Sequence, residues 1–216
     1  MQVGSGDASY SFVGNQDLAK YLTVQTTNGV LSITATGLPS GESVTPIAVI
    51  VSAPSSTSLS SIVASGQGDV SVLPGLASSE SLTITSSGQG DVTGLFNVTN
   101  ELTIDSSGQG DIDVGGQIGS LAITGSGQGD VSVFGVQGPA TVDITGQGDT
   151  FISGTNGLSI TGSNEGMGDL SYEGGECSVP NAFFSSNCVK SSGASPPNPT
   201  LPDPTGRGIY SASYSC

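Results

Sequence analysis

The residues of this sequence with the clearest capacity for chemistry are six aspartates that recur in one local setting. Each closes a Ser-Gly-Gln-Gly-Asp segment or a close variant of it, and they are Asp69, Asp91, Asp111, Asp130, Asp149 and Asp169. A row of carboxylates could bind Ca²⁺, a cation that prefers oxygen ligands. The simpler interpretation is that each carboxylate accepts hydrogen bonds from the N–H groups of its own turn, as aspartates in turns commonly do.

The spacing of these aspartates favours the simpler interpretation. Successive members lie 22, 20, 19, 19 and 20 residues apart. Calcium-binding β-rolls repeat their motif about every nine residues, so they bring more carboxylates to each site. One aspartate per repeat supplies few oxygens for a closed calcium site. We therefore expect no cofactor, and Ca²⁺ is the one alternative that stays open.

Composition argues against catalysis and against binding to nucleic acid. The 216 residues include no His, and the formal net charge is −15. Without His there is no imidazole base, no Ser-His-Asp triad and no His-ligated zinc. The cations are Lys20, Lys190 and Arg207, too few to bind a phosphate backbone or to hold an acidic polysaccharide for cleavage. We expect that the protein is not an enzyme.

The repeat predicts the fold, because a period near 20 residues is typical of one coil of a β-solenoid. A second short strand should follow each marker segment, as in Asp69–Val72. Identical strands stacked in parallel need right-handed crossovers, so we predict an all-β, right-handed parallel β-helix. Before each marker lies an alternating run typical of a strand with one buried face; the runs are Ser81–Thr85, Glu101–Asp105, Ser120–Thr124, Thr141–Thr145 and Gly157–Thr161.

Stacking of the coils should align equivalent side chains. The predicted inward ladder consists of Ile84, Ile104, Ile123, Ile144 and Ile160. The marker glutamines should form an amide ladder of Gln67, Gln89, Gln109 and Gln128, which Gln147 continues and Met167 breaks. The outward threonines suggest a flat array like that of some ice-binding solenoids, but Asp105 interrupts their column. We therefore interpret them as solvated strand residues.

The marker glycines, such as Gly108 and Gly110, should lie at a sharp corner between two strands. We expect positive φ angles at one or two of the positions in each corner. We also expect that any side chain there would clash with the adjacent coil.

The β-helix domain should cover residues 1–189, with less regular N-terminal coils over 1–64, regular repeats over 65–175 and a C-terminal cap over 176–189. Strands are expected at Leu22–Gln25, Val30–Thr34 and Pro46–Val51, the first two flanking a turn at Thr27–Gly29. Residues 190–216 are rich in Pro, Ser and Gly, so we expect a linker or a tail. No apolar run is long enough to span a bilayer.

The three cysteines lie towards the C-terminal end of the chain. Cys177 and Cys188 are eleven positions apart and could form a disulfide or remain two reduced thiols. The extracellular character of the rest of the chain favours the disulfide. Cys216 would then be unpaired or would bond to another chain. Phe183 and Phe184, between the first two cysteines, should cover the last coil.

These motifs together resemble the head GIN domain family of autotransporter adhesins. The resemblance covers roughly residues 3 to 180 and rests on Thr27–Ile33, Val49–Pro54, the serial markers and the closing segment Gly166–Gly174. It implies a β-helical domain of the cell envelope, with adhesion suggested by the family name, and it transfers no catalytic residues. This chain departs from the family in its near-uniform Gln between the marker glycines, in its cysteine-bearing end, and in beginning after the family's first strand.

We therefore expect a secreted or cell-surface structural or interaction module, in adhesion or in the extracellular matrix. Glycans or cell-surface proteins are the expected partners, and self-association through the ends of the solenoid or through Cys216 is a further expectation. Two alternatives stay open. One is a calcium-dependent binding module, and the other is a β-helix that binds or cleaves polysaccharides.

Overall fold

The computed structural model describes residues 2–4, 9–13, 16–37, 48–180, 188–199 and 209–215. The chain divides into two compact units, one of Met1–Ser55 with Leu201–Cys216 and one of Ser56–Thr200. The described regular structure is β apart from the four-residue helix α1 (Gln16–Ala19).

The first unit contains a sheet built from both ends of the chain. Its strand order is β1 (Gln2–Gly4), β5 (Ala48–Pro54), β2 (Ser9–Val13) and β18 (Ile209–Ser215). A separate hairpin pairs β3 (Leu22–Thr27) with β4 (Val30–Ala35) in antiparallel register. Its two turn residues, Asn28 and Gly29, have φ angles of 51° and 78°. These angles fit a two-residue turn that matches the twist of the flanking strands.

This arrangement confirms the predicted turn and corrects the coils predicted over residues 1–64, of which only the part after Ser55 belongs to the unit of stacked coils. Strands β1 to β5 lie outside the sheet of stacked coils, and antiparallel pairing joins β2 to β5 and β3 to β4. The reason is local for β3 and β4, because a two-residue Asn-Gly turn returns the chain directly alongside itself. Strands β2 and β5 pair across a much longer stretch of chain. Of the expected N-terminal strands, residues 46 and 47 lie outside the described residues.

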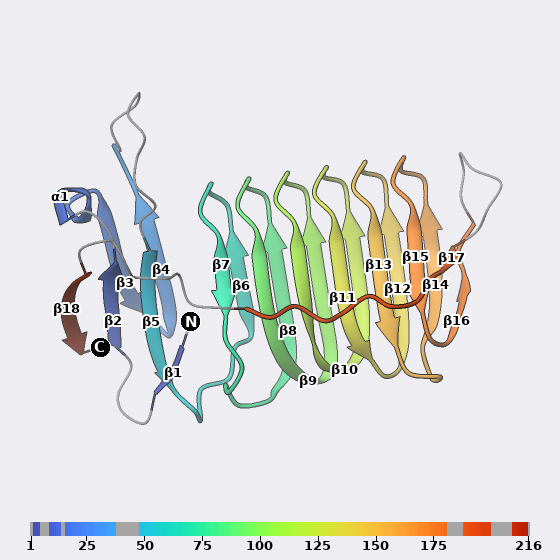
Figure 1. The fold of residues 1–216 in the computed structure, drawn as a ribbon, viewed down its shortest axis with the longest axis horizontal. Helices are drawn as coiled ribbons and strands as arrows, with labels where there is room; N and C mark the ends of the chain where they lie inside the picture. The colour runs from blue at the N-terminus through green and yellow to red at the C-terminus, as the bar shows by residue number, and fades with distance from the viewer. Residues whose placement is uncertain are drawn as a thin grey trace. The chain divides into compact units, whose positions relative to one another are not determined.

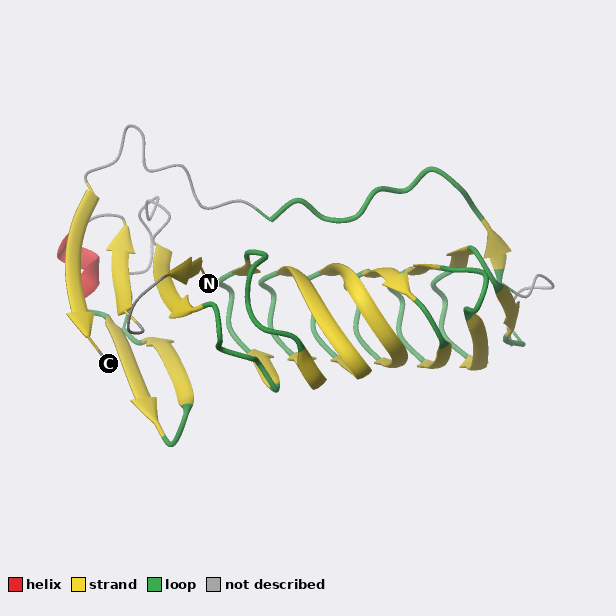
Figure 2. Cartoon of the chain, turned by 90° about the horizontal axis from the view of Figure 1, so that it is seen from below, coloured by secondary structure: helices red, strands yellow, loops and turns green. Residues whose placement is uncertain are grey.

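The second unit is the predicted parallel β-helix, in which parallel strands stack into two faces (Figures 1 and 2). Face A holds β6 (Ser61–Ala64), β8 (Ser79–Ser86), the second halves of β9 (Val92–Ser106) and β10 (Ile112–Gly125), β12 (Pro139–Ile144), β14 (Ser159–Asn164) and β16 (Glu176–Ser178). Face B holds β7 (Val70–Val72), the first halves of β9 and β10, β11 (Val131–Val136), β13 (Thr150–Gly154), β15 (Leu170–Glu173) and β17 (Val189–Lys190). The marker segments form the corner at which the chain leaves face A and enters face B.

The coil period is confirmed by the strand register. Val70 pairs with Val92, Val92 with Ile112 and Ile112 with Val131 along face B. These partners are 22, 20 and 19 residues apart, like the first three intervals between the marker aspartates. Each marker therefore stacks on the marker of the neighbouring coil.

The core is a column of aliphatic side chains between the two faces. Ile84, Leu102 and Ile104 are fully buried on face A, and Val114 and Val133 are fully buried on face B. Each strand alternates between buried and more exposed residues, because successive side chains point to opposite sides of a strand.

The predicted isoleucine ladder is confirmed for three members and wrong for two. Ile84, Ile104 and Ile123 are successive register partners, and Val142 continues their column. Ile144 belongs to a neighbouring column, and Ile160 pairs with Ala140.

Residues of neighbouring coils pair when they lie at the same distance from the marker, whether or not both are isoleucines. Ile104 lies four residues before Gly108, whereas Ile144 lies only two residues before Gly146. The displacement is two residues, and a displacement of two keeps a side chain on the same side of the strand. Ile144 is therefore buried in spite of its different column.

The expected tail over residues 190–216 is corrected in two places. Lys190 ends strand β17, and residues 209–215 form β18. Residues 191–199, here called the strap, run along the outside of the solenoid away from β17 (Figure 2). Pro197 and Pro199 within the strap are buried. Burial of these prolines comes from long-range packing, for which the local sequence holds no periodic signal.

The marker glycines are required by contact between coils. A Cβ atom added to Gly110 would overlap the Gly90 carbonyl group, with the carbonyl carbon only 2.6 Å away. The same overlap recurs at Gly88, Gly108, Gly129 and Gly148. The expectation of positive φ is wrong, because none of the marker glycines is among the residues with positive φ. The clash predicted for a side chain is confirmed.

Two substitutions at equivalent marker positions test whether the glycines are required by contact between coils. We expect Gly110→Ala to lower the free energy of unfolding by about 3 kcal/mol or more, because the methyl group meets backbone that cannot rotate away. Gly68 occupies the same place in the first marker, and no atom lies within 4 Å of the Cβ it would carry. Gly68→Ala should be neutral or stabilising by up to about 1 kcal/mol. Urea unfolding followed by circular dichroism measures both, and equal losses would contradict the contact explanation.

Candidate functional site

The corner ridge is the most regular polar surface of the solenoid. It consists of the exposed side chains of the marker aspartates and glutamines: Gln67, Asp69, Gln89, Asp91, Gln109, Asp111, Gln128, Asp130, Gln147, Asp149 and Asp169. The turn after each face-A strand brings these side chains to one edge, and stacking repeats them at roughly 4.8 Å. The six aspartates predicted as candidate metal ligands are therefore brought into one row.

The aspartates form a hydrogen-bonded ladder from coil to coil. The Asp111 N–H donates to Asp91 Oδ1 at 2.8 Å, and the Asp130 N–H donates to Asp111 Oδ1 at 2.8 Å. Equivalent bonds of 2.7 to 3.0 Å link the remaining neighbours. The donor is the N–H of the next coil and not of the same turn, which corrects the expectation from sequence. Each carboxylate from Asp69 to Asp149 therefore joins two coils.

A backbone bond in the opposite direction completes each link. The Val92 N–H donates to the Asp111 carbonyl oxygen at 2.8 Å, beside the bond from the Asp111 N–H to Asp91. Adjacent carboxylates repel each other by about 1 kcal/mol in water. A hydrogen bond to a charged acceptor contributes about 1.5–3 kcal/mol when it is shielded from water, and less at an exposed corner. The ladder thus offsets the cost of stacking like charges.

The predicted glutamine ladder is present beside the aspartates from Gln67 to Gln128, and its continuation to Gln147 stays a prediction. Gln67 Nε2 donates to Gln89 Oε1 at 2.9 Å, and Gln89 Nε2 donates to Gln109 Oε1 at 3.0 Å. A longer bond of 3.4 Å joins Gln109 to Gln128. Met167 takes the glutamine position in the last marker and is 57% exposed. The ridge therefore changes from amide to thioether at its C-terminal end.

The donor set of the ridge fits Ca²⁺ poorly. One oxygen of each carboxylate from Asp69 to Asp149 already accepts a backbone N–H. Calcium takes six to eight oxygen ligands in its protein sites. Among the described residues, no three side chains of His, Cys, Asp or Glu come together as a metal site requires.

Asp113 is a carboxylate that sequence reasoning did not single out. It lies half-buried on the outer side of face B, and its Oδ1 atom is buried with no hydrogen-bond partner. Burial, with the charge of Asp111 adding to it, raises the pKa of the Asp113 carboxyl above its ordinary value. The alternating run Asp111–Val114 places this side chain outward, but its burial depends on packing that the run does not encode.

Asn164 is a second polar residue that the sequence patterns missed. Its side chain is 1% exposed. Its Nδ2 donates to the Gly168 carbonyl at 3.0 Å, while its Oδ1 accepts from the Gly166 N–H at 3.1 Å. The side chain thus holds the last marker corner from inside. Asn164 lies two residues before the first marker glycine, where earlier coils have Ser86 and Ser106, and this replacement is the signal that could have identified it.

The predicted disulfide between Cys177 and Cys188 is confirmed. Cys177 lies in β16 on face A, and Cys188 immediately precedes β17 on face B. The bond therefore fixes the two faces of the last coil to each other. Residues 181–187 and residue 216 lie outside the described part of the chain, so the expectations for Phe183, Phe184 and Cys216 stay predictions.

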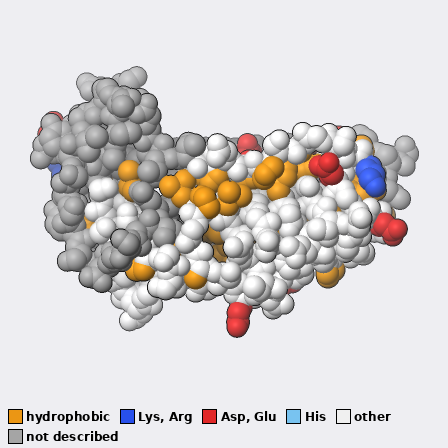
Figure 3. Space-filling view, turned by 60° about the horizontal axis from the view of Figure 1, so that its bottom comes forward, with side chains coloured by type: hydrophobic (Ala, Val, Ile, Leu, Met, Phe, Trp, Pro, Cys, Tyr) orange, Lys and Arg blue, Asp and Glu red, His pale blue; other side chains and the backbone are white. Residues whose placement is uncertain are grey.

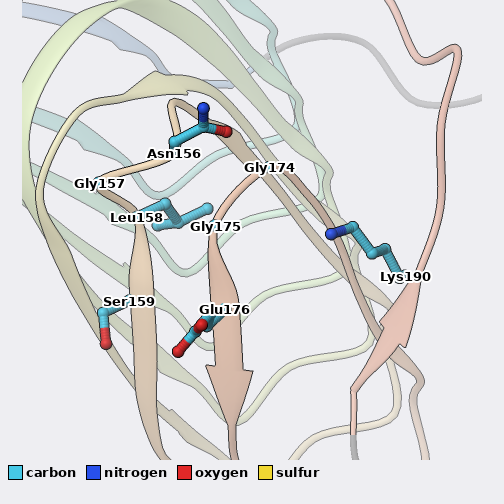
Figure 4. Close-up of a pocket in the computed structure, with 8 residues that line it drawn as sticks. All are labelled: Asn156, Gly157, Leu158, Ser159, Gly174, Gly175, Glu176 and Lys190. Carbon is cyan, nitrogen blue, oxygen red and sulfur yellow. The ribbon is translucent and has the colours of Figure 1, made fainter.

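A polar pocket of about 380 Å³ lies at the last coils of the solenoid. Figure 4 shows Lys190 extending its amine towards Gly174 and Gly175, while the carboxylate of Glu176 points away from that amine. The Lys190 Nζ atom lies 5.7 Å from the centre of the Tyr172 ring. Glu176 is the one carboxylate among the lining residues, whereas glycoside hydrolysis uses a pair. The pocket suits a small polar group and lacks the pair that glycoside cleavage needs.

The fold and the ridge together define a class of protein, a parallel β-solenoid with a repeated polar surface. The family model described as "Putative auto-transporter adhesin, head GIN domain" matches residues 4–175. The chain belongs to this family, whose description is that of an adhesin and not of an enzyme. No curated protein and no solved structure matches the chain significantly.

The family description suggests a location at the cell surface or outside the cell. Within the part of the chain that the structure describes, no helix is long and apolar enough to cross a lipid bilayer.

Substitution of Asp113 tests its unfavourable environment. Because the pKa of the Asp113 carboxyl is higher in the folded protein than in the unfolded chain, its ionisation lowers the stability of the folded protein at pH values above the pKa of the unfolded chain. This loss of stability disappears as the pH falls below the pKa of the unfolded chain. We expect Asp113→Asn to raise the melting temperature by roughly 1–3 °C at pH 7 and by less at pH 3. Thermal unfolding of both proteins across this range measures the difference. A difference that does not change with pH would show that ionisation of Asp113 is not the cause.

Proposed function

We propose that this chain is a non-catalytic interaction module that acts in adhesion or in the extracellular matrix, with glycans or cell-surface proteins as its partners. The observation that carries this proposal is the open outer side of face A. It presents mostly short polar side chains in straight columns, with the exposed Val63 in the first coil, and the strap does not lie on it (Figures 1 and 2).

Two columns form most of this surface. Thr83, Thr103 and Ala122 are successive register partners in one, and Thr85, Asp105 and Thr124 are partners in the other. Thr141 and Asp143 extend the two columns by one coil. Hydroxyl and carboxylate groups repeated at roughly 4.8 Å suit a ligand that is itself repetitive and rich in hydrogen-bonding groups. A glycan chain has this chemistry.

The disulfide supports a location outside the cell, and the net charge limits the class of partner. Disulfides persist in oxidising compartments, and the bond between Cys177 and Cys188 is part of the last coil. The net charge of −15 disfavours nucleic acid and other polyanions as partners. A neutral glycan or a basic protein surface avoids this repulsion.

Both alternatives have weaker support. A calcium-dependent module would require ligands beyond the aspartates whose oxygens already accept N–H groups. A polysaccharide-cleaving enzyme would require paired carboxylates, and the pocket beside Lys190 is lined by Glu176 alone. Binding of a polysaccharide without cleavage agrees with the main proposal.

Binding to an array of neutral and acidic glycans, followed by titration of the best ligand, tests the use of face A. We expect the variant Thr103→Arg with Thr124→Arg to lose at least tenfold in affinity, because two long side chains rise from a flat surface. The matched control, Asn97→Arg with Asn100→Arg, adds the same charge at exposed residues on the opposite corner and should stay within twofold. Equal losses in both variants, or no binding to any glycan or surface protein, would refute the proposal.

Calcium titration tests the role of the corner ridge. We expect the melting temperature to change by less than about 2 °C between millimolar calcium and excess chelator, because binding to the folded state would raise it. Asp111→Asn keeps an oxygen that can accept the Asp130 N–H, so it should melt close to the unsubstituted protein in both conditions. A large rise with calcium that Asp111→Asn abolishes would instead establish the calcium-dependent module.

A further inference from the structure

The outer side of face B carries two aromatic side chains, Phe134 and Phe151, among polar ones. Phe134 follows the inward Val133, so it lies on the outer side of β11, yet it is only 8% exposed. Its ring lies 5.3 Å from the ring of Phe151 on β13. In the space-filling view, hydrophobic side chains gather in a lengthwise band on an otherwise mostly polar surface (Figure 3).

Gly115 creates a depression within this apolar surface. A Cβ atom on Gly115 would lie 3.2 Å from Phe134 Cβ and 3.4 Å from Leu95 Cδ2. The same Cβ would lie 3.4 Å from the Cδ atom of Pro197 in the strap. Pro197 therefore packs directly against the position at which a side chain of Gly115 would begin. The contact is van der Waals packing of a proline ring into a depression flanked by Leu95 and Phe134.

The composition of the strap fits its path. The strap crosses the strands of face B instead of running beside them (Figure 1), so no strand offers it a ladder of hydrogen bonds. Three of the four residues from 196 to 199 are prolines, which have no N–H group. Pro197 and Pro199 can therefore be buried without leaving a donor unsatisfied.

The length of the strap fixes which proline meets Gly115. The face-B strand order runs from β17 through β15, β13 and β11 to β10, which carries Gly115. Four interstrand steps amount to roughly 19 Å. The seven residue-to-residue steps from Lys190 to Pro197 span about 22 Å in an extended proline-type conformation. The strap has little slack, and its beginning is held by β17 next to the disulfide at Cys188.

We propose that the outer side of face B, at Leu95, Gly115, Phe134 and Phe151, is a binding site for an extended proline-rich peptide. The chain's own residues 196–199 occupy this site, and a partner with a proline-rich segment binds there when the strap is displaced. Grooves lined by aromatic side chains bind such peptides because the extended conformation is already formed and little entropy is lost. The site lies on a different face from the proposed glycan surface and does not depend on it.

A labelled peptide tests this site on the full chain. The probe is a fluorescein-labelled nonapeptide with the sequence of residues 191–199, and fluorescence anisotropy gives its affinity. We expect Pro197→Asp with Pro199→Asp to release the strap and to bind the probe at least tenfold more tightly than the unsubstituted chain, whose own strap competes at millimolar effective concentration. Faster proteolysis between Ser192 and Ala194 confirms the release.

Two controls make the result specific. Ser195→Asp with Asn198→Asp adds the same charge at exposed strap residues, so it should leave the strap bound and should not increase probe binding. Adding Phe134→Ser to the released variant should reduce probe binding at least tenfold. If that protein does not fold, Gly115→Val in the same background fills the depression instead. Equal binding by the released and unsubstituted chains, or binding insensitive to both substitutions, overturns the proposal.

Discussion

The close approach of neighbouring backbones at the marker corners is the constraint on which the rest of the solenoid depends. The carbonyl of Gly90 lies where a side chain of Gly110 would begin, and the same contact repeats from coil to coil. Parallel pairing then continues from the corner into the strands on both sides of it, so the corner sets their register up to the shifts that follow face B. This explains why Val142 and not Ile144 follows Ile123 in the core. The apolar residues adapt to a register that the corners impose.

Stacking identical corners also stacks identical charges. The bond from the N–H of Asp111 to the carboxylate of Asp91 turns this repulsive arrangement into a connection between coils. The glutamines beside them are linked in the same way by Gln89 and Gln109. A motif that looks like a metal site in the sequence therefore has a sufficient structural role. The surface that remains for binding a partner is the broad polar surface that the coils present between their corners.

The two faces of the solenoid differ in what covers them. Face A presents Thr103 and Thr124 to its surroundings, whereas face B carries Phe134 beneath a strap of prolines. The disulfide at Cys177 and Cys188 lies where the strap begins. One solenoid thus offers a polar surface that is open and an apolar surface that its own chain occupies. These surfaces differ in chemistry and can be tested separately.

The sequence by itself determined the β-helix, its period and the glutamine ladder, because each of these follows from spacing that repeats. It favoured the disulfide without excluding two reduced thiols, and the structure decided between them. Tertiary structure decided the rest. The columns of Ile144 and Ile160, the partner of each aspartate, the burial of Asp113 and the strap over Phe134 all depend on which coil lies next to which residue. The antiparallel strands before residue 55 likewise depend on pairing between distant segments, such as β2 with β18. Local periodicity fixes the conformation of a strand, whereas contacts between distant residues fix its partners.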